Sequence, residues 1–181
     1  MSKQLIGLVG TNSAGKSTIC DLLKAKGYTV FSLSDIVREE AAHKGLPSIR
    51  ANLIKIGSEL KTKNGPAILA QQSFQKVLDQ NLTKVAFDSI RHPAEVQYLQ
   101  EQGVIIIGID APIELRYQRI KLRQKDTDKV NFATFKKHEE LEMNGQSSGQ
   151  NLAACFKLCS TIIINDQDLK HLEQQIANAL N

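Results

Sequence analysis

The sequence has no tryptophan, and aromatic residues make up only 5% of its 181 residues. Platforms that bind single-stranded nucleic acid stack the bases on aromatic side chains, so this scarcity argues against such a function. The net charge of +4 is modest, and it fits a few cations around a polyphosphate as well as it fits a nucleic-acid surface. We therefore expect small-molecule partners and no nucleic acid.

Long apolar runs are missing as well. No stretch approaches the roughly 20 apolar residues that a membrane-spanning helix needs. The apolar segment Leu5–Val9 is too short for the central region of a signal peptide. These observations predict a cytoplasmic protein that does not associate with membranes.

Cysteine is scarce, with three residues and no C-x-x-C pair. Cys155 and Cys159 lie four residues apart and would share one face of a helix, so a metal pair is one interpretation. No nearby histidine or cysteine completes such a site, and we favour small buried apolar side chains. A chain of this length buries a continuous core as a single domain, without disulfides or structural metal.

Five short runs of apolar and β-branched residues are predicted to be buried strands. Their nearly continuous apolar character is typical of parallel strands, which are covered on both faces. The runs are Leu5–Val9, Tyr28–Phe31, Val85–Phe87, Val104–Ile109 and Ile162–Ile164.

Helical patterns lie between these strands. The alternation of strand and helix predicts an α/β fold, with a five-stranded parallel sheet and helices on both faces. Residues 34–81 hold too many helices for one crossover, which predicts an insertion, and the polar residues 124–151 are predicted to form a lid. The predicted helices are Lys16–Lys26, Asp35–Lys44, Ala51–Lys61, Ala67–Gln80, Pro93–Gln102, Pro112–Arg123, Phe132–Met143 and Asp168–Leu180.

The most specific motif follows the first predicted strand. Residues 10–18 read Gly-Thr-Asn-Ser-Ala-Gly-Lys-Ser-Thr and fit the G-x-x-x-x-G-K-[ST] pattern of a P-loop NTPase. The glycines let backbone N–H groups approach phosphate oxygens, Lys16 reaches the β- and γ-phosphates, and Ser17 offers its hydroxyl to Mg²⁺. The following helix adds the positive end of its dipole. The predicted ATP-binding residues here are Gly10, Asn12, Ser13, Ala14, Gly15, Lys16, Ser17 and Thr18.

With this loop and three further motifs, the chain resembles the nucleoside monophosphate kinases, the adenylate- and cytidylate-kinase-like group. More distantly, it resembles dephospho-coenzyme A kinases. It departs from the group at Ser89, where many members have glycine, and in the lid, which has no cysteine cluster. The motifs are Ser34-Asp35-Ile-Val-Arg38, then Phe87-Asp88-Ser89-Ile90-Arg91-His92-Pro93, and the arginines Arg116, Arg119 and Arg123.

This resemblance implies a kinase that uses ATP and Mg²⁺ and acts on small nucleotide substrates. It implies that the insertion at about 34–81 binds the acceptor through Ser34, Asp35 and Arg38, together with Arg91 from the third strand. It also places Asn165 in the loop beside the adenine of ATP.

Asp88 is predicted at the end of an apolar strand. Carboxylates at the carboxyl edge of an open α/β sheet point into the ligand crevice, so we interpret Asp88 as a partner of Mg²⁺ together with Ser17. The alternative is a cap for the helix that follows. The presence of Arg91 in the same short loop favours the functional interpretation.

Arg38 and Arg91 are predicted to approach the acceptor phosphate from opposite sides, because guanidinium groups bind phosphate oxygens in pairs. Asp35 has two interpretations. It begins a helix or, in a kinase that acts on a sugar hydroxyl, it is the base that removes the proton. A phosphate acceptor needs no base, because it is already ionised near neutral pH.

The predicted helix before the lid carries two stripes, one apolar and one cationic. Neighbouring cations repel one another unless an anion is bound, so we predict that Arg119 and Arg123 stabilise the transferred phosphoryl group. Together with Lys16 and Asp88, they are the predicted catalytic residues. The apolar stripe is Ile113, Tyr117 and Ile120, and the cationic stripe is Arg116, Arg119 and Arg123.

The sequence thus predicts an ATP-dependent phosphotransferase for a nucleoside or deoxynucleoside monophosphate, working as a monomer or homodimer. Two alternatives stay open. One is a hydroxyl-directed small-molecule kinase such as a dephospho-coenzyme A kinase, and the other is a non-catalytic ATP-binding regulatory module. The arginine stripe favours an enzyme, because a binding module has no use for cations aimed at a transition state.

Overall fold

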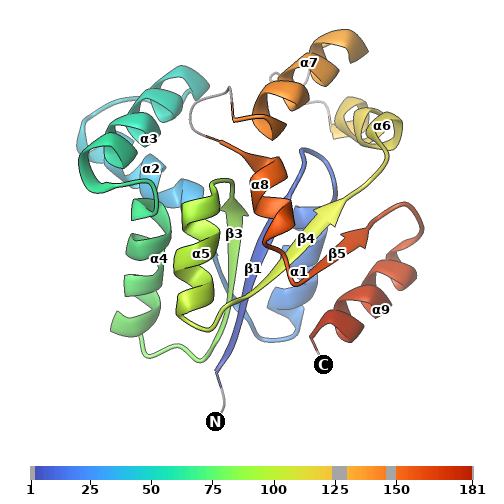
Figure 1. The fold of residues 1–181 in the computed structure, drawn as a ribbon, viewed down its shortest axis with the longest axis horizontal. Helices are drawn as coiled ribbons and strands as arrows, with labels where there is room; N and C mark the ends of the chain where they lie inside the picture. The colour runs from blue at the N-terminus through green and yellow to red at the C-terminus, as the bar shows by residue number, and fades with distance from the viewer. Residues whose placement is uncertain (1–2, 124–129, 146–149, 181) are drawn as a thin grey trace.

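The computed structural model describes residues 3–123, 130–145 and 150–180. Its centre is a five-stranded sheet with the order β2-β3-β1-β4-β5, in which every pair of neighbours is parallel (Figure 1). The predicted α/β fold with a five-stranded parallel sheet is therefore confirmed. The strands are β1 (Gln4–Gly10), β2 (Thr29–Ser32), β3 (Lys84–Ile90), β4 (Ile105–Asp110) and β5 (Thr161–Ile164).

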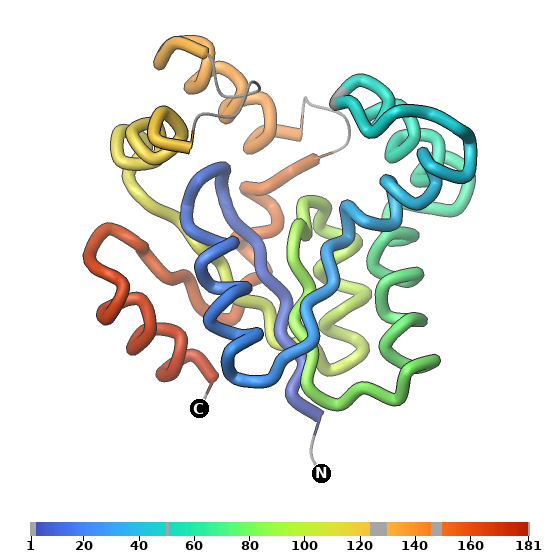
Figure 2. Tube along the Cα trace, turned by 180° about the vertical axis from the view of Figure 1, so that it is seen from behind, coloured from blue at the N-terminus to red at the C-terminus, as the bar shows by residue number. Residues whose placement is uncertain are grey.

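Side chains that alternate along β1 divide the core into two layers. Leu5 and Val9 belong to one buried cluster, whereas Ile6 and Leu8 belong to the other. Both faces are apolar, as in strands covered on both sides. The first cluster is covered by α4 (Ile68–Asp79), α5 (Pro93–Glu101) and α8 (Leu152–Lys157), and the second by α1 (Lys16–Ala25) and α9 (Leu169–Ala179), which lie in front of the sheet in Figure 2.

The strand order places a crevice at the carboxyl end of β1. In the strand order, β2 and β3 lie to one side of β1, and β4 and β5 lie to the other. The chain goes from β1 through α1 to β2, and after β3 it passes over β1 to β4. Connections that leave a strand in opposite directions create a switch point, where open α/β sheets bind ligands. The fold therefore brings the ends of β1, β3 and β4 together at one site.

The predicted insertion, residues 34–81, separates into two parts. The helices α2 (Leu33–His43) and α3 (Arg50–Asn64) rise beside the carboxyl ends of the strands (Figure 1). The third helix, α4, instead belongs to the core layer, because Phe74 stacks on Phe87 of β3 with ring centroids 6.1 Å apart. The part that borders the crevice is thus the α2–α3 pair.

The predicted lid begins after α6 (Ile113–Arg123) and contains α7 (Phe132–Met143), but residues 124–129 and 146–149 lie outside the described part. Phe135 of α7 is buried, and its ring lies 5.7 Å from that of Tyr117 on α6. The ring of Phe132 lies 5.1 Å from the same tyrosine. The lid helix therefore has more apolar contact than its polar composition suggests.

Helix α8 was not predicted from the sequence. It has only six residues, too few to show a clear helical period. It begins at Asn151, whose side-chain oxygen accepts a hydrogen bond from the backbone N–H of Ala154 at 3.0 Å. Cys155 of this helix is buried, and burial raises its pKa to about 12, which matches the interpretation as a small apolar side chain. None of the helices in the described ranges is long and apolar enough to cross a membrane.

Candidate active site

The P-loop connects β1 to α1 in a conformation that requires glycine at two points. A Cβ atom on Gly10 would overlap the carbonyl oxygen of Ile109 on β4. Gly15 has φ of 106°, and its Cβ would overlap the side-chain amide of Asn165. An L side chain at either position would force the loop away from its neighbours, so the two glycines of the motif are sterically required.

Lys16 folds over this loop. Its Nζ donates hydrogen bonds to the carbonyl oxygens of Gly10 at 2.7 Å and Thr11 at 2.8 Å. Burial lowers the pKa of Lys16 to about 8, while the nearby carboxylate of Asp88 opposes that shift. The ammonium group is thus held in a desolvated position where an incoming anion stabilises its charge.

The N-terminus of α1 has no side-chain cap and no acidic residue in its first turn. The first N–H groups of a helix lack intrahelical acceptors, and phosphate oxygens satisfy them well. Ser17 and Thr18 lie exposed in this first turn. The predicted ATP-binding residues of the loop thus lie next to a helix N-terminus whose free N–H groups an anion would satisfy.

Asp88 lies at an irregularity in β3. Gly7 of β1 pairs with Phe87, but Val9 pairs with Ile90, so β3 carries one extra residue at this point. Within the described residues, Oδ1 of Asp88 is buried and has no hydrogen-bond partner. The cap of the following helix, α5, is His92, so the alternative interpretation of Asp88 as a helix cap is wrong.

This arrangement fits Mg²⁺. A magnesium ion in a nucleotide site is typically held by one or two protein oxygens together with phosphate oxygens and water. No group of three histidine, cysteine or acidic side chains in the described ranges forms a separate metal centre. The hydroxyl of Ser17 and the buried Oδ1 of Asp88 are the oxygen ligands that would hold the ion beside the phosphates.

Arg91 is fixed by its backbone, which leaves its side chain for the crevice. Its N–H donates to Oε2 of Glu95 at 2.9 Å, and its carbonyl accepts from the N–H of Asn151 at 2.9 Å. Glu95 is buried, also accepts from the N–H of His92 at 3.1 Å, and forms an ion pair with Lys61 of α3 at 3.0 Å. The loop is thereby tied both to α3 and to the start of α8.

On the opposite side, α2 carries the other acceptor candidates. Arg38 forms an exposed ion pair with Asp35 at 2.7 Å, a type of pair that stabilises a protein by only ~0–1 kcal/mol. A phosphate group would therefore compete for Arg38 at little cost. Asp35 lies in the first turn of α2, as one of its two interpretations proposed.

The three arginines of α6 do not form one exposed cationic stripe. Arg116 is buried and paired through both terminal nitrogens with Glu139 of α7, and its Nε donates to the carbonyl of Ala111 at 2.6 Å. Arg116 thus joins the lid helix to α6, and this corrects the prediction of a separate cationic stripe. The spacing of residues along a helix shows which of them share a face, but it does not show which other element covers that face.

Arg119 is directed toward Asn165, in the loop after β5, and not toward Glu139 of the lid helix. Its Nη2 donates to the backbone carbonyl of Asn165 at 2.9 Å, and its Nη1 is buried with no hydrogen-bond partner in the described part of the chain. Burial lowers the pKa of Arg119 from its usual value. Asn165 itself donates to the carbonyl of Ala14 at 2.8 Å, so Arg119 and Asn165 lie together beside the loop.

A cleft of about 540 Å³ lies between the P-loop, the α2–α3 pair and the lid, within the usual volume of small-molecule sites. Cations from four helices and from the loop after β3 line it: Lys16, Arg38, Lys61, Arg91 and Arg123. Of the predicted residues, Gly10, Asn12 and Ser34 also line it. The other predicted residues lie outside its described lining: Ser13, Ala14, Gly15, Ser17, Thr18, Asp35, Asp88, Arg119 and Asn165.

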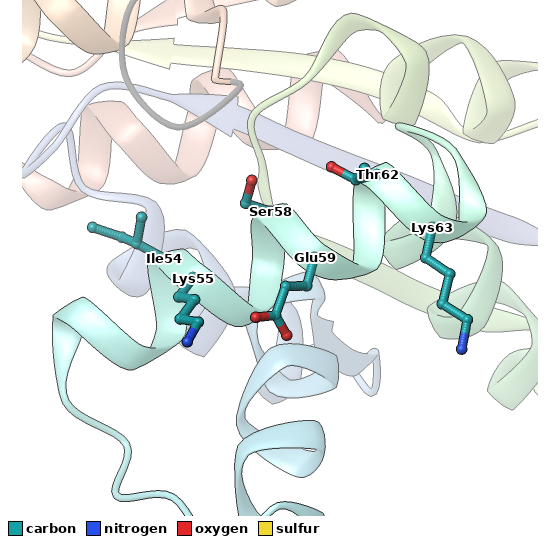
Figure 3. A pocket seen from close by; sticks show the side chains of 6 residues that line it. All are labelled: Ile54, Lys55, Ser58, Glu59, Thr62 and Lys63. Carbon is teal, nitrogen blue, oxygen red and sulfur yellow. The ribbon is translucent and has the colours of Figure 1, made fainter.

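A second hollow of about 620 Å³ lies along α3 (Figure 3), and two of its lining residues, Ile54 and Ser58, also line the cleft. Its six lining side chains all come from this single helix: Ile54, Lys55, Ser58, Glu59, Thr62 and Lys63. Groups on one helix cannot converge on a ligand from several directions. The cleft is therefore the candidate active site.

Sequence reasoning missed several residues that support the site. The spacing His92-x-x-Glu95 is that of a capping box, and this signal could have identified Glu95. No local signal links Glu95 with Lys61. Asp110 was also missed, although its carboxylate accepts a hydrogen bond from Thr11 of the P-loop at 2.7 Å.

A family model described as "AAA domain" matches residues 6–144, more than half of the chain. The chain belongs to this AAA domain family. The family match covers the P-loop, the α2–α3 pair, Asp88, Arg91 and most of the lid.

Two relatives of this AAA-domain protein come from archaea. The "UPF0200/UPF0201 protein" of Archaeoglobus fulgidus is 32% identical over 149 residues, which are 78% of this chain but only 46% of that protein. The chain thus spans less than half the length of that relative. The "UPF0200 protein" of Hyperthermus butylicus is 24% identical over 178 residues, covering 98% of this chain and 93% of that protein.

Among solved structures, the shikimate kinase from Bacteroides thetaiotaomicron superimposes with a TM-score of 0.63. The alignment covers 99% of both chains with 12% sequence identity. At this identity the likeness shows the fold alone. The AAA-domain protein therefore has a P-loop kinase-like α/β fold.

Proposed function

We propose that this protein is an ATP-dependent phosphotransferase that acts on a nucleoside or deoxynucleoside monophosphate. The observation that carries the proposal is the cleft in which Lys16, Arg38, Arg91 and Arg123 converge from separate elements. Cations around a shared space suit two phosphorylated substrates, because phosphoryl transfer depends mainly on positioning and charge stabilisation.

The donor side is the P-loop. Lys16 and the N-terminus of α1 would bind the β- and γ-phosphates, and Ser17 and Asp88 would hold Mg²⁺. Arg119 and Asn165, which lie together beside the loop, would border the nucleotide on the adenine side. Arg123, which lines the cleft at the end of α6, remains the arginine best placed for the transferred group.

The acceptor side favours a phosphate over a hydroxyl. A hydroxyl acceptor needs a base, and the candidate Asp35 lies outside the described lining of the cleft. Of the three glutamates in the described lining of the cleft, Glu95 is paired with Lys61, Glu139 is paired with Arg116, and Glu142 also has an interaction partner. A monophosphate is ionised near neutral pH and needs only the arginines.

A coupled assay of phosphotransfer from ATP tests the proposal. The acceptors are a panel of nucleoside and deoxynucleoside monophosphates, with dephospho-coenzyme A and shikimate as hydroxyl acceptors. We expect turnover with at least one monophosphate and with neither hydroxyl acceptor. Turnover with a hydroxyl acceptor alone would replace the proposal, and ATP binding without transfer to any acceptor would indicate a regulatory module.

Arg91→Ala assigns the acceptor side. Loss of charged hydrogen bonds costs about 1.5–3 kcal/mol, so we expect the acceptor KM to rise by roughly 10- to 100-fold. Affinity for an ATP analogue should change by less than about twofold, since the loss is confined to the acceptor. Lys24→Ala, an exposed cation of α1 paired with Asp21, is the matched control and should leave both constants unchanged. A selective loss of ATP affinity in Arg91→Ala would reverse the assignment.

A further inference from the structure

Ser89 has a backbone conformation that is unusual for a residue with a side chain. Its φ is 63°, in the left-handed region that glycine enters without cost and other L residues enter at a cost. It sits at the irregularity of β3 where the extra residue is accommodated. Glycine would satisfy the backbone here, and what serine adds is a hydroxyl group.

The hydroxyl of Ser89 lies in a short hydrogen-bonded series. Its Oγ is 3.2 Å from Oδ2 of Asp88 and 3.1 Å from Oγ of Ser32, at the end of β2. An ionised carboxylate only accepts hydrogen bonds, so Ser89 donates to Asp88 and accepts from Ser32. Ser32 is also the register partner of Asp88 across the β2–β3 pair, which keeps the three residues together.

This series distinguishes the two oxygens of Asp88. Oδ2 is occupied by Ser89, whereas Oδ1 is buried and has no hydrogen-bond partner among the described residues. A buried carboxylate oxygen without a partner is costly unless a ligand satisfies it. A side chain held at one oxygen cannot rotate freely, so the other oxygen keeps a fixed direction.

We propose that Ser89 is a positioning residue, whose hydroxyl orients Asp88 so that Oδ1 faces the metal of a bound Mg²⁺–nucleotide. Ser32 supports it by donating a hydrogen bond to the Ser89 hydroxyl. This inference rests on the proposed function. It explains why a side chain is present where the backbone favours glycine. It also assigns Ser32, which no motif identified, to the same task.

The test is the affinity of Mn²⁺ for the protein saturated with a non-hydrolysable ATP analogue, measured by electron paramagnetic resonance. Ser89→Gly keeps the backbone conformation and removes the hydroxyl. We expect a Mn²⁺ affinity about 3- to 10-fold weaker, the range of one neutral hydrogen bond, because the lost hydroxyl acts on the metal only through Asp88. The melting temperature should be equal or higher, because glycine relieves the backbone cost.

Two further variants distinguish positioning from general damage. Ser32→Ala should weaken Mn²⁺ binding in the same direction but less, and in Ser32→Ala/Ser89→Gly the two losses should not add, because both act through one carboxylate. Asn81→Gly is the matched control, since Asn81 also has a positive φ of 51° but lies between α4 and β3. It should change the melting temperature without changing Mn²⁺ affinity.

Wild-type Mn²⁺ affinity in Ser89→Gly would overturn the inference, as would an equal loss of metal-free nucleotide affinity. Failure of the wild-type protein to bind Mn²⁺ with the analogue would overturn it as well. The measurement needs no acceptor, so it is separate from the phosphotransfer panel. If the wild-type protein phosphorylates a monophosphate but Ser89→Gly keeps its metal affinity, only this inference is wrong. If the wild-type protein phosphorylates no monophosphate but Ser89→Gly shows the expected loss of metal affinity, only the acceptor assignment is wrong.

Discussion

The two ends of the cleft are built in different ways. At the phosphate end, Gly10 and Gly15 have no room for a Cβ atom, because β4 and Asn165 press against the loop. At the acceptor end, Gly57 lies inside α3 and lines the cleft, yet a Cβ there would meet only Val37, at 3.8 Å. The backbone of the P-loop is therefore closely surrounded by neighbouring atoms, whereas the α3 backbone at Gly57 has room for a side chain.

The difference follows from what each end recognises. The triphosphate of the donor always has the same shape and charge, so a rigid loop of backbone N–H groups with one fixed geometry binds it well. The acceptor is bound by side chains on two helices outside the sheet, where substitutions change the shape of the site without disturbing the core. We therefore expect side chains of the α2–α3 pair to determine which acceptor binds, and we expect substitutions of the P-loop glycines to impair the binding of the donor phosphates.

The largest effect is expected at the phosphate end from Lys16→Ala. It removes the one ammonium group that the P-loop holds over its carbonyl oxygens, so both ATP affinity and turnover should fall. A loss of roughly 3–4 kcal/mol in transition-state stabilisation corresponds to about 100- to 1,000-fold in kcat/KM. Steady-state kinetics and titration of an ATP analogue measure both, with Lys24→Ala on the same helix as the control. Full activity in Lys16→Ala would contradict the assignment of the P-loop.

A pair of glycine substitutions tests the comparison directly. Gly10→Ala forces a methyl group against the carbonyl of Ile109 and should lower the free energy of unfolding by about 1–3 kcal/mol. Gly57→Ala should raise it by up to ~1 kcal/mol, because alanine is the better helix former and the space is open. Urea titrations of the two variants give both values. If the two substitutions had the same sign, the contrast between the ends of the cleft would be wrong.

The smallest effect concerns pH. The pKa of Lys16 is lowered to about 8, below its unfolded value, and bound phosphates would raise it again. ATP binding should therefore take up protons at and above about pH 8, and ATP affinity should fall as the pH rises through this value. In the ligand-free protein, the unfolded chain binds more protons between about pH 8 and the ordinary lysine pKa, so this group makes stability rise with pH there.

Calorimetric titration of an ATP analogue in two buffers of different ionisation enthalpy measures the proton uptake. Lys16→Met, which keeps much of the side-chain length and lacks the charge, should lose this uptake. Uptake that persisted in Lys16→Met would assign the proton to another group.

Much of the architecture was predictable because its signals are local. The strands β1 and β4 and the helices α1 and α7 lie within one or two residues of their predicted bounds, since apolar runs and caps act over short distances. Helix α8 escaped prediction because six residues carry too little periodicity. The different surroundings of Arg116 and Arg119 escaped it because one helix period cannot say which neighbour lies opposite.

The sequence by itself determined the parallel sheet and the P-loop, because the chemistry of each lies within a few consecutive residues. Only the tertiary structure decided which cations share the cleft, that Glu95 joins Lys61 to the Arg91 loop, and that Ser32 and Ser89 engage one oxygen of Asp88. Most of these contacts join residues that are tens of positions apart, and Lys16 and Arg123 are more than a hundred positions apart. They form only once the sheet brings the carboxyl ends of β1, β2 and β3 to one edge.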